Sequence, residues 1–152
     1  LSNISPLEPR DCSATCLFAF RFGDGLIHLG MLGDGLVAAL KPDCSVVSLT
    51  EDKGYGFSNI TTALSTNVSL NEWRHISLPE EECIAVFLCT DGVADDLDDV
   101  DGFVSGFIEA HCSIAEISAN RRTREMLEKW PTPKHSDDKT IACLFREDAP
   151  DA

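Results

Sequence analysis

The chain has few basic residues. It contains 12 Lys and Arg against 26 Asp and Glu, and its formal net charge is −14 over 152 residues. Nucleic-acid backbones are bound through clustered Lys and Arg, and anionic membrane surfaces attract the same residues. The composition therefore excludes nucleic acid and an anionic membrane as main partners. No apolar run approaches the length that a membrane-spanning helix needs.

Paired cysteine motifs are also missing. Seven cysteines are scattered along the chain, mostly inside apolar runs, and no Cys-x-x-Cys occurs. Such pairs are typical of zinc sites, so Cys12 and Cys16 predict none. Buried cysteine behaves as a small hydrophobic residue, and we interpret the pattern as that of a protein from the reducing cytoplasm. The four histidines are equally scattered, and we interpret each as structural or solvated.

The composition that remains is that of an ordinary globular domain. Hydrophobic residues make up 43% of the chain and charged residues 25%, and the length suits one domain over residues 1–152 with its own core. Four short apolar runs are separated by Gly, Asp and Pro, which favour turns. They predict an antiparallel meander of strands over 13–22, 26–32, 36–40 and 44–49.

The pattern changes in the second half. Residues 51–82 are polar and are interpreted as a long surface loop, and 83–90 is predicted to be a buried strand. Apolar residues then recur at the helical spacing i, i+3, i+4, i+7 within 98–111. A second helix is predicted over 114–130 and a last strand over 138–146. Strands, then helices, then a strand predict an α+β layered fold.

Three apolar segments adjoin carboxylates. The run Cys83–Thr90 ends at Asp91, Asp34 follows the second predicted strand, and Asp137 precedes the last one. A carboxylate at the end of a buried strand is costly unless it is paired, and a hard divalent cation is a suitable partner. The three positions therefore predict one site for Mg²⁺ or Mn²⁺.

Five short motifs occur in an order that resembles the metal-dependent protein phosphatases of type 2C, in particular their bacterial branch. Each is weak alone, but the ordered set covers about residues 12–146 and is more specific. The motifs are Ser13-Ala14-Thr15, Leu29–Gly35, Phe57–Leu64, Phe87–Val93 and Asp137–Ala142.

This resemblance implies a fold, an activity and a set of ligands. The fold would be part of a β-sandwich of antiparallel strands flanked by helices. The activity would be hydrolysis of phosphoserine and phosphothreonine in phosphoproteins by metal-activated water, as in bacterial signalling opposite a cognate kinase. Asp91 and Asp137 would be ligands of the binuclear Mg²⁺ or Mn²⁺ pair, and Asp34 and Asp95 would line a third ion position. The residues expected to support these ligands are Asp138, Gly92 and Gly35.

One part of the family pattern is missing. The upstream Glu-Asp pair, the bridging Asp-Gly and the phosphate-binding Arg of the family have no counterpart in residues 1–12. The chain therefore resembles only the C-terminal part of such a phosphatase, and we expect it to bind metal weakly and to be inactive alone. The alternatives are a non-catalytic domain that acts through partner binding, or a missing N-terminal half supplied by another chain.

A different phosphatase class fits less well. Thr90-Asp91-Gly92 also resembles the aspartyl-phosphate phosphatases of the haloacid dehalogenase type. Their nucleophilic Asp would stand two residues before Asp91, where this chain has Cys89.

Overall fold

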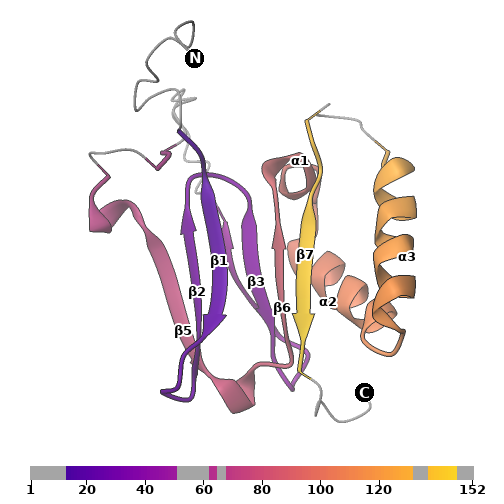
Figure 1. Cartoon of the computed structure of the whole chain (residues 1–152), viewed down its shortest axis with the longest axis horizontal. Coiled ribbons are helices and arrows are strands. Elements are labelled where there is room, and N and C mark those ends of the chain that lie inside the picture. Colours follow the sequence, from indigo (N-terminus) through magenta and orange to yellow (C-terminus); the bar gives the residue numbers. More distant parts are fainter. Residues whose placement is uncertain (1–12, 51–61, 65–67, 132–136, 147–152) are drawn as a thin grey trace, which may run out of the picture.

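Two antiparallel β-sheets form the centre of the computed structural model, which describes residues 13–50, 62–64, 68–131 and 137–146 (Figure 1). One sheet has the strand order β1-β2-β5 and the other β4-β3-β6-β7. The strands of the described residues are β1 (Cys16–Arg21), β2 (Leu26–Leu32), β3 (Leu36–Leu40), β4 (Val46–Thr50), β5 (Arg74–Pro79), β6 (Ala85–Cys89) and β7 (Ile141–Phe145).

The bounds of β2 and β3 agree with the prediction, and the β1–β2 and β3–β4 pairings of the predicted meander are present, but its β2–β3 pairing is wrong. β2 pairs with β1 and β5, whereas β3 pairs with β4 and β6 in the other sheet. The turn at Gly33–Gly35 therefore carries the chain from one sheet to the other. The sequence does not distinguish a β2–β3 hairpin from a crossing between sheets. β3 is buried along its whole length, and a continuous apolar run does not specify which strand lies beside it.

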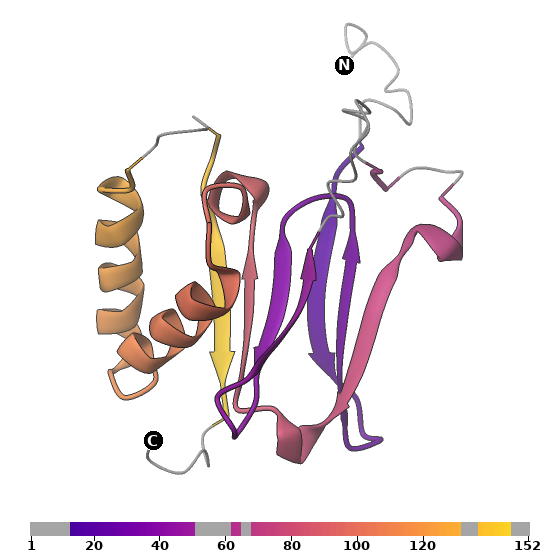
Figure 2. The same cartoon turned by 180° about the vertical axis from the view of Figure 1, so that it is seen from behind.

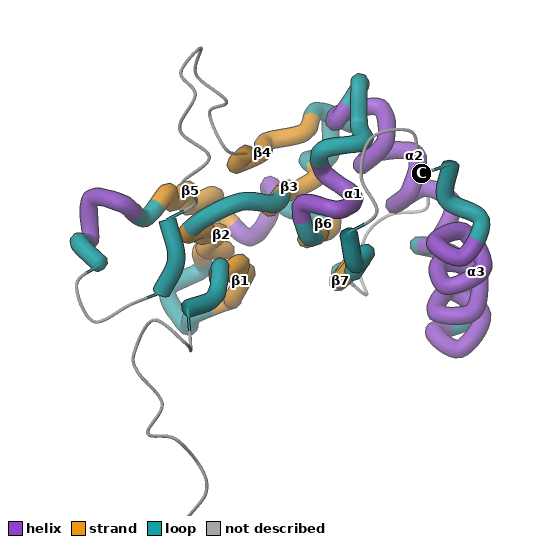
Figure 3. The backbone as a smooth tube through the Cα atoms, turned by 90° about the horizontal axis from the view of Figure 1, so that it is seen from above, coloured by secondary structure: helices purple, strands orange, loops and turns teal. Residues whose placement is uncertain are grey.

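The three α-helices among the described residues lie on the outer side of the four-stranded sheet, away from β1 and β2 (Figures 2 and 3). Their bounds are α1 (Asp91–Ala94), α2 (Val100–His111) and α3 (Glu116–Glu128). The prediction of a helix within 98–111 is confirmed, with Asp99 accepting a hydrogen bond from the Gly102 amide at the N-terminus of α2. That bond satisfies an amide which the helix itself leaves unpaired.

The core has two layers. Between the sheets, Leu29 and Met31 of β2 pack with Val37 and Ala39 of β3. Between the four-stranded sheet and the helices, Phe87 is fully buried, and its ring centroid lies 5.2 Å from that of Phe107 in an edge-to-face contact. Side chains of this size each contribute roughly 1.5–3 kcal/mol when buried, so both faces of the four-stranded sheet are fixed by packing.

The segment interpreted as a loop contains a strand. Residues 74–79 form β5, which pairs antiparallel with β2 along its whole length. The polar residues His75 and Ser77, which concealed it, alternate with the apolar Ile76 and Leu78, as expected of a strand with one face towards the core. The predicted loop over 51–61 and the irregular N-terminal segment 1–12 lie outside the described residues.

Aromatic residues mark the outer face of the three-stranded sheet. Phe18 and Phe20 stack with their centroids 5.5 Å apart, and Phe20 and Phe22 are exposed by 46% and 67%. No helix of the described residues covers this face. Within the same residues, none of the helices is both long and apolar enough to cross a membrane.

The burial of the cysteines predicts their reactivity. Burial raises the pKa of the Cys89 and Cys143 thiols to about 12, and each pKa unit lowers the thiolate fraction about tenfold. Cys44 and Cys112 are exposed. We expect iodoacetamide at mildly alkaline pH to modify these two in the native protein and to reach Cys89 and Cys143 only after denaturation, as measured by peptide mass spectrometry. Equal rates of modification for the exposed and the buried pair would contradict the burial of Cys89 and Cys143 in the core.

Candidate functional site

The predicted acidic positions lie at one end of the four-stranded sheet. The β2–β3 connection, α1 and the start of β7 lie at the same end of the molecule (Figure 1). Leu36 pairs with Cys89 at the end of the β3–β6 ladder, so Asp34 and Asp91 each lie two residues beyond that end. Cys89 pairs in turn with Ile141 in the β6–β7 ladder, which places the segment that begins at Asp137 on the other side of Asp91.

Asp91 lies where β6 gives way to α1. Thr90 keeps an extended backbone and Asp91 is the first residue of the helix. The Asp91 carboxylate accepts a hydrogen bond from the Gly92 amide at 2.8 Å, which restrains its direction. Asp95 follows one turn later, and its amide donates to the Asp91 carbonyl at 2.8 Å. Residues four apart lie on one helix face, so Asp91 and Asp95 belong to the same side of α1.

Thr90 ties this end of β6 to the segment that carries Asp137. Its amide donates to the Thr140 carbonyl at 3.1 Å, and its hydroxyl accepts from the Thr140 amide at 3.0 Å. The same hydroxyl donates to the Asp138 carbonyl at 3.1 Å. One side chain thus holds the backbone of 138–140 at a fixed distance from Asp91.

Two glycines permit the close approach of backbones at this end. A Cβ at Gly92 would lie 2.6 Å from the Asp138 carbonyl oxygen and 3.1 Å from that of Asp137. A Cβ at Gly35 would lie 2.8 Å from the Cys89 carbonyl oxygen, and Gly35 has a φ of +111°, which side-chain-bearing residues rarely adopt. Any larger residue at Gly92 would push α1 away from the Asp137–Asp138 backbone.

The carboxylates share an edge but are not gathered around one point. In this structure, no three His, Cys, Asp or Glu side chains of the described residues are grouped so that they could hold a metal ion. Asp34 and Asp91 are half-buried, and Asp137 is exposed. The donor set is carboxylate oxygen, the kind that Mg²⁺ and Mn²⁺ prefer. Chemistry and placement therefore suit a hard cation, and the ligand roles of Asp34, Asp91, Asp95 and Asp137 remain predictions.

Cys89 is unsuited to the role of a nucleophile. Burial raises the pKa of its thiol to about 12, and the nearby negative charge of Asp91 contributes in the same direction. The thiolate, which is the reactive form, is therefore scarce at neutral pH. This agrees with the weak fit of the haloacid dehalogenase pattern.

A buried ion pair next to the acidic edge was not predicted. The Lys139 ammonium lies 3.7 Å from the Asp96 carboxylate, and their side chains are exposed by only 8% and 2%. The Trp130 indole N–H donates to the same Asp96 oxygen at 2.9 Å, and Lys139 also donates to the Asp137 carbonyl at 3.4 Å. These contacts join the end of α1, the end of α3 and the start of β7.

An open pocket of about 690 Å³ adjoins this ion pair. It lies between α3 and the start of β7, and both Asp137 and Asp138 contribute to its wall. On the α3 side it is lined by Arg124 and Glu128, whose side chains form an ion pair at 2.9 Å. The pocket therefore offers charged groups of both signs beside Asp137.

Comparisons with known proteins agree with this architecture. The chain matches the profile of the family described as Protein phosphatase 2C over residues 2–130. Two antiparallel sheets with helices and an acidic edge thus define a phosphatase-like α+β domain. The chain belongs to the protein phosphatase 2C family, as its motifs predicted.

Solved structures resemble the fold at low sequence identity. A bacterial serine phosphatase carrying an arginine-to-glutamate mutation has a TM-score of 0.53 and 17% identity, with 86% of this chain and 52% of that chain covered. A sex-determining protein of C. elegans has a TM-score of 0.55 and 16% identity, with 88% and 40% covered. This chain thus spans about half the length of the former. A search of curated proteins found no match.

Removing the Thr90 hydroxyl tests the connection between β6 and the Asp137 segment. Thr90→Val keeps the shape of the side chain but leaves the Asp138 carbonyl and the Thr140 amide without this partner. We expect the free energy of unfolding to fall by about 1–3 kcal/mol, measured by urea denaturation. Thr90→Ser, which keeps the hydroxyl, is the control and is expected to lose less. A loss in Thr90→Val no larger than that in Thr90→Ser would contradict the role of the hydroxyl.

Removing the acidic partner tests the buried ion pair. Asp96→Ala leaves the Lys139 ammonium without its carboxylate and the Trp130 indole without its acceptor. Breaking a buried pair in this way costs about 3–5 kcal/mol. The matched control is Glu109→Ala, which truncates an exposed acid on α2 and is expected to change stability by less than about 0.5 kcal/mol. The measurement is thermal unfolding. Equal midpoints for the two variants would contradict a stabilising ion pair between Asp96 and Lys139.

Proposed function

We propose that this chain supplies one edge of the metal site of a serine/threonine phosphatase. Membership of the protein phosphatase 2C family supports a phosphatase-like domain. The observation that carries the proposal is the strand register around β6, which brings Asp34, Asp91 and the Asp137 segment to one end of the sheet. Phosphorylated serine and threonine of a protein are the substrate class that this family suggests.

Four carboxylates have distinct roles in this proposal. Asp91 and Asp137 hold a Mg²⁺ or Mn²⁺ pair, and Asp34 and Asp95 support an additional ion. Such ions, when bound, activate a water and neutralise charge on the phosphoryl group. The residues of this chain orient the ligands: the Gly92 amide restrains Asp91, and the Thr90 hydroxyl holds the Asp138 backbone. Asp138 and the two close-approach glycines, Gly92 and Gly35, support the ligands without touching an ion.

The pocket beside α3 is the proposed path of the substrate chain. Its wall includes Asp137, together with Arg124 and Lys139, whose charges are each paired with an acidic side chain, Glu128 and Asp96. A cognate kinase is the matching partner, since a phosphatase acts on what a kinase has modified. The six cysteines of the described residues are free thiols, which supports a place in the reducing cytoplasm.

The chain alone is proposed to be inactive. It spans about half of the bacterial serine phosphatase that it resembles, and its described carboxylates are not grouped around one ion position. The same two observations favour a second candidate, a phosphatase-like domain that acts by binding a partner. An upstream half on the same or another chain, with the family's Glu-Asp and Asp-Gly ligands, distinguishes the enzyme from the binding domain.

Metal affinity tests the role of Asp91. Calorimetric titration of the chain with Mn²⁺ is expected to show weak binding that falls at least about tenfold in Asp91→Asn, because a neutral amide binds a hard cation less well than a carboxylate does. Asp101→Asn removes an equal charge from an exposed position on α2 and serves as the control. Unchanged affinity in Asp91→Asn would remove this residue as a ligand.

Hydrolysis is tested with a phosphothreonine peptide and Mn²⁺. We expect no turnover by the 152-residue chain and turnover once an upstream half with the missing ligands is supplied. Strong Mn²⁺-dependent hydrolysis by the chain alone would contradict the proposal that further ligands are needed. If the chain binds metal but hydrolyses no peptide even after the upstream half has been supplied, the partner-binding domain would be favoured.

A further inference from the structure

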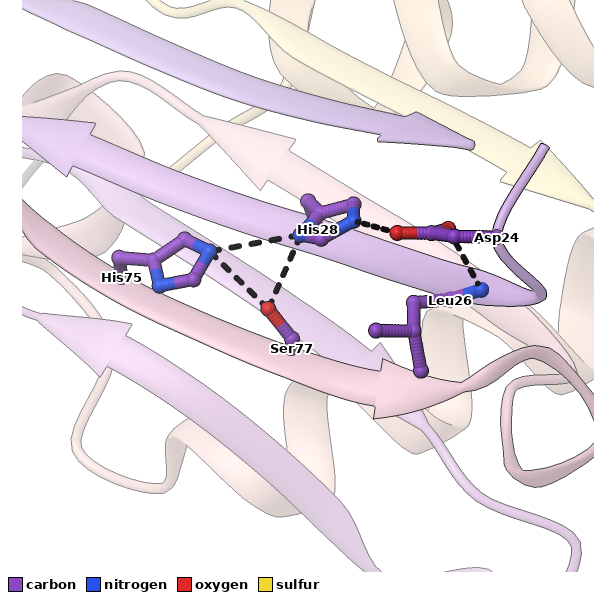
Figure 4. A network of polar contacts seen from close by, with 5 residues as sticks. All are labelled: Asp24, Leu26, His28, His75 and Ser77. Carbon is purple, nitrogen blue, oxygen red and sulfur yellow. Dashed lines mark hydrogen bonds and ion pairs between the residues drawn. The ribbon is translucent and has the colours of Figure 1, made fainter. Parts of the chain in front are cut away.

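Two of the histidines that are scattered in the sequence come together on the outer face of the three-stranded sheet. His28 of β2 lies directly opposite Ser77 of β5, and His75 is paired with Gly30, one diagonal step away. The neighbours Ile27 and Leu29 pack into the core between the sheets. Because side chains alternate along a strand, His28 points to the opposite face, where Figure 4 shows it beside His75 and Ser77.

The polar atoms of this cluster are close to one another. The His28 Nδ1 atom lies 2.9 Å from the Ser77 hydroxyl, the His75 Nε2 atom lies 3.0 Å from the same hydroxyl, and the two ring nitrogens are 3.5 Å apart. A tetrahedral Zn²⁺ with ligands at about 2.0–2.1 Å holds neighbouring ligands about 3.3 Å apart. The triangle of two nitrogens and one oxygen therefore has the size of one face of such a coordination sphere.

A carboxylate lies behind one ring. Asp24, in the β1–β2 turn, lies 3.1 Å from the His28 Nε2 atom. In the tautomer that donates from Nε2 to this carboxylate, Nδ1 presents a lone pair towards His75. The Leu26 amide donates to the other Asp24 oxygen at 3.0 Å, and this backbone hydrogen bond lowers the pKa of Asp24. A carboxylate behind a histidine is the common arrangement around metal-binding imidazoles.

The surroundings hold the rings in place and leave the cluster open to solvent. The Phe20 ring stacks on His28 with centroids 4.9 Å apart, which limits rotation of the imidazole. His75 and Ser77 are exposed, and the His28 side chain is 18% exposed. An ion can therefore reach the cluster, and its remaining coordination positions face water.

We propose that His28, His75 and Ser77 form a binding site for a divalent transition metal of the Zn²⁺ type, with Asp24 as the positioning residue. The proposed ligands are two imidazoles and one hydroxyl. The described residues contain no group of three His, Cys, Asp or Glu side chains that could hold a metal ion. Imidazole favours Zn²⁺, Ni²⁺ and Cu²⁺ over Mg²⁺, so the site is chemically distinct from the acidic edge. A bound ion would join β2 to β5.

Zinc titration of the whole chain in excess Mg²⁺ tests this site. Binding is followed by calorimetry and by the ¹⁵N shifts of the histidine ring nitrogens, which separate imidazole binding from binding to thiols. His28→Gln and His75→Gln are each expected to lower the Zn²⁺ affinity at least about tenfold, and Asp24→Asn about tenfold, as is usual for loss of a carboxylate behind a ligand. Ser77→Ala is expected to have a smaller effect.

Two controls define the location. His135→Gln removes a histidine elsewhere in the chain, and Asp91→Asn alters the acidic edge; both are expected to leave the Zn²⁺ affinity unchanged. Circular dichroism tests whether each variant is folded. If a variant is unfolded, the ring-nitrogen shifts of the wild-type chain on addition of Zn²⁺ decide whether the histidines bind the ion. The proposal is overturned if Zn²⁺ leaves the ring nitrogens of His28 and His75 unshifted, since the cluster is then hydrogen-bonded only. It is equally overturned if folded variants at both histidines bind Zn²⁺ as the wild type does.

Discussion

The pairing of β6 on both of its edges is the interaction on which the rest of the structure depends. β6 lies between β3 and β7, and its backbone groups are used by these two neighbours, as a buried strand requires. Phe87 at its centre is fully buried against the aromatic rings of α2. Because the strand cannot slide without breaking both ladders and this packing, the position of Asp91 at its end is fixed.

The acidic edge follows from that constraint. β3 begins and β7 begins where β6 ends, so the register brings the segments that carry Asp34 and Asp137 to the same end of the sheet as Asp91. Gly92 and the Thr90 hydroxyl then set how closely the backbones approach. Behind the edge, the buried pair of Asp96 and Lys139 joins two helix ends to the start of β7. The protein thus holds its carboxylates at or next to the ends of strands and of α1, although the side chains of the described residues are not grouped around one point.

Much of this was predictable from local pattern, and the exceptions have physical reasons. The apolar runs and turn residues predicted β2, β3 and α2 closely, because these elements are specified by their own residues. Which sheet β3 joins could not be predicted, since a strand buried on both faces carries no sign of its neighbours. The positions of the acidic edge were predicted because each carboxylate adjoins an apolar run. The Asp96–Lys139 pair and the cluster of His28 and His75 were missed, because their members are 43 and 47 residues apart and meet only through strand and helix packing.

We propose that one end of the four-stranded sheet forms a hard-cation site from Asp34, Asp91 and Asp137. Anomalous scattering from crystals of the chain soaked in Mn²⁺ tests this site directly. We expect a manganese peak at the end of β6, within coordination distance of carboxylate oxygens of Asp91 and Asp137. A protein that is intact in such crystals but shows no peak there, or binds manganese only through other acidic residues, would contradict it.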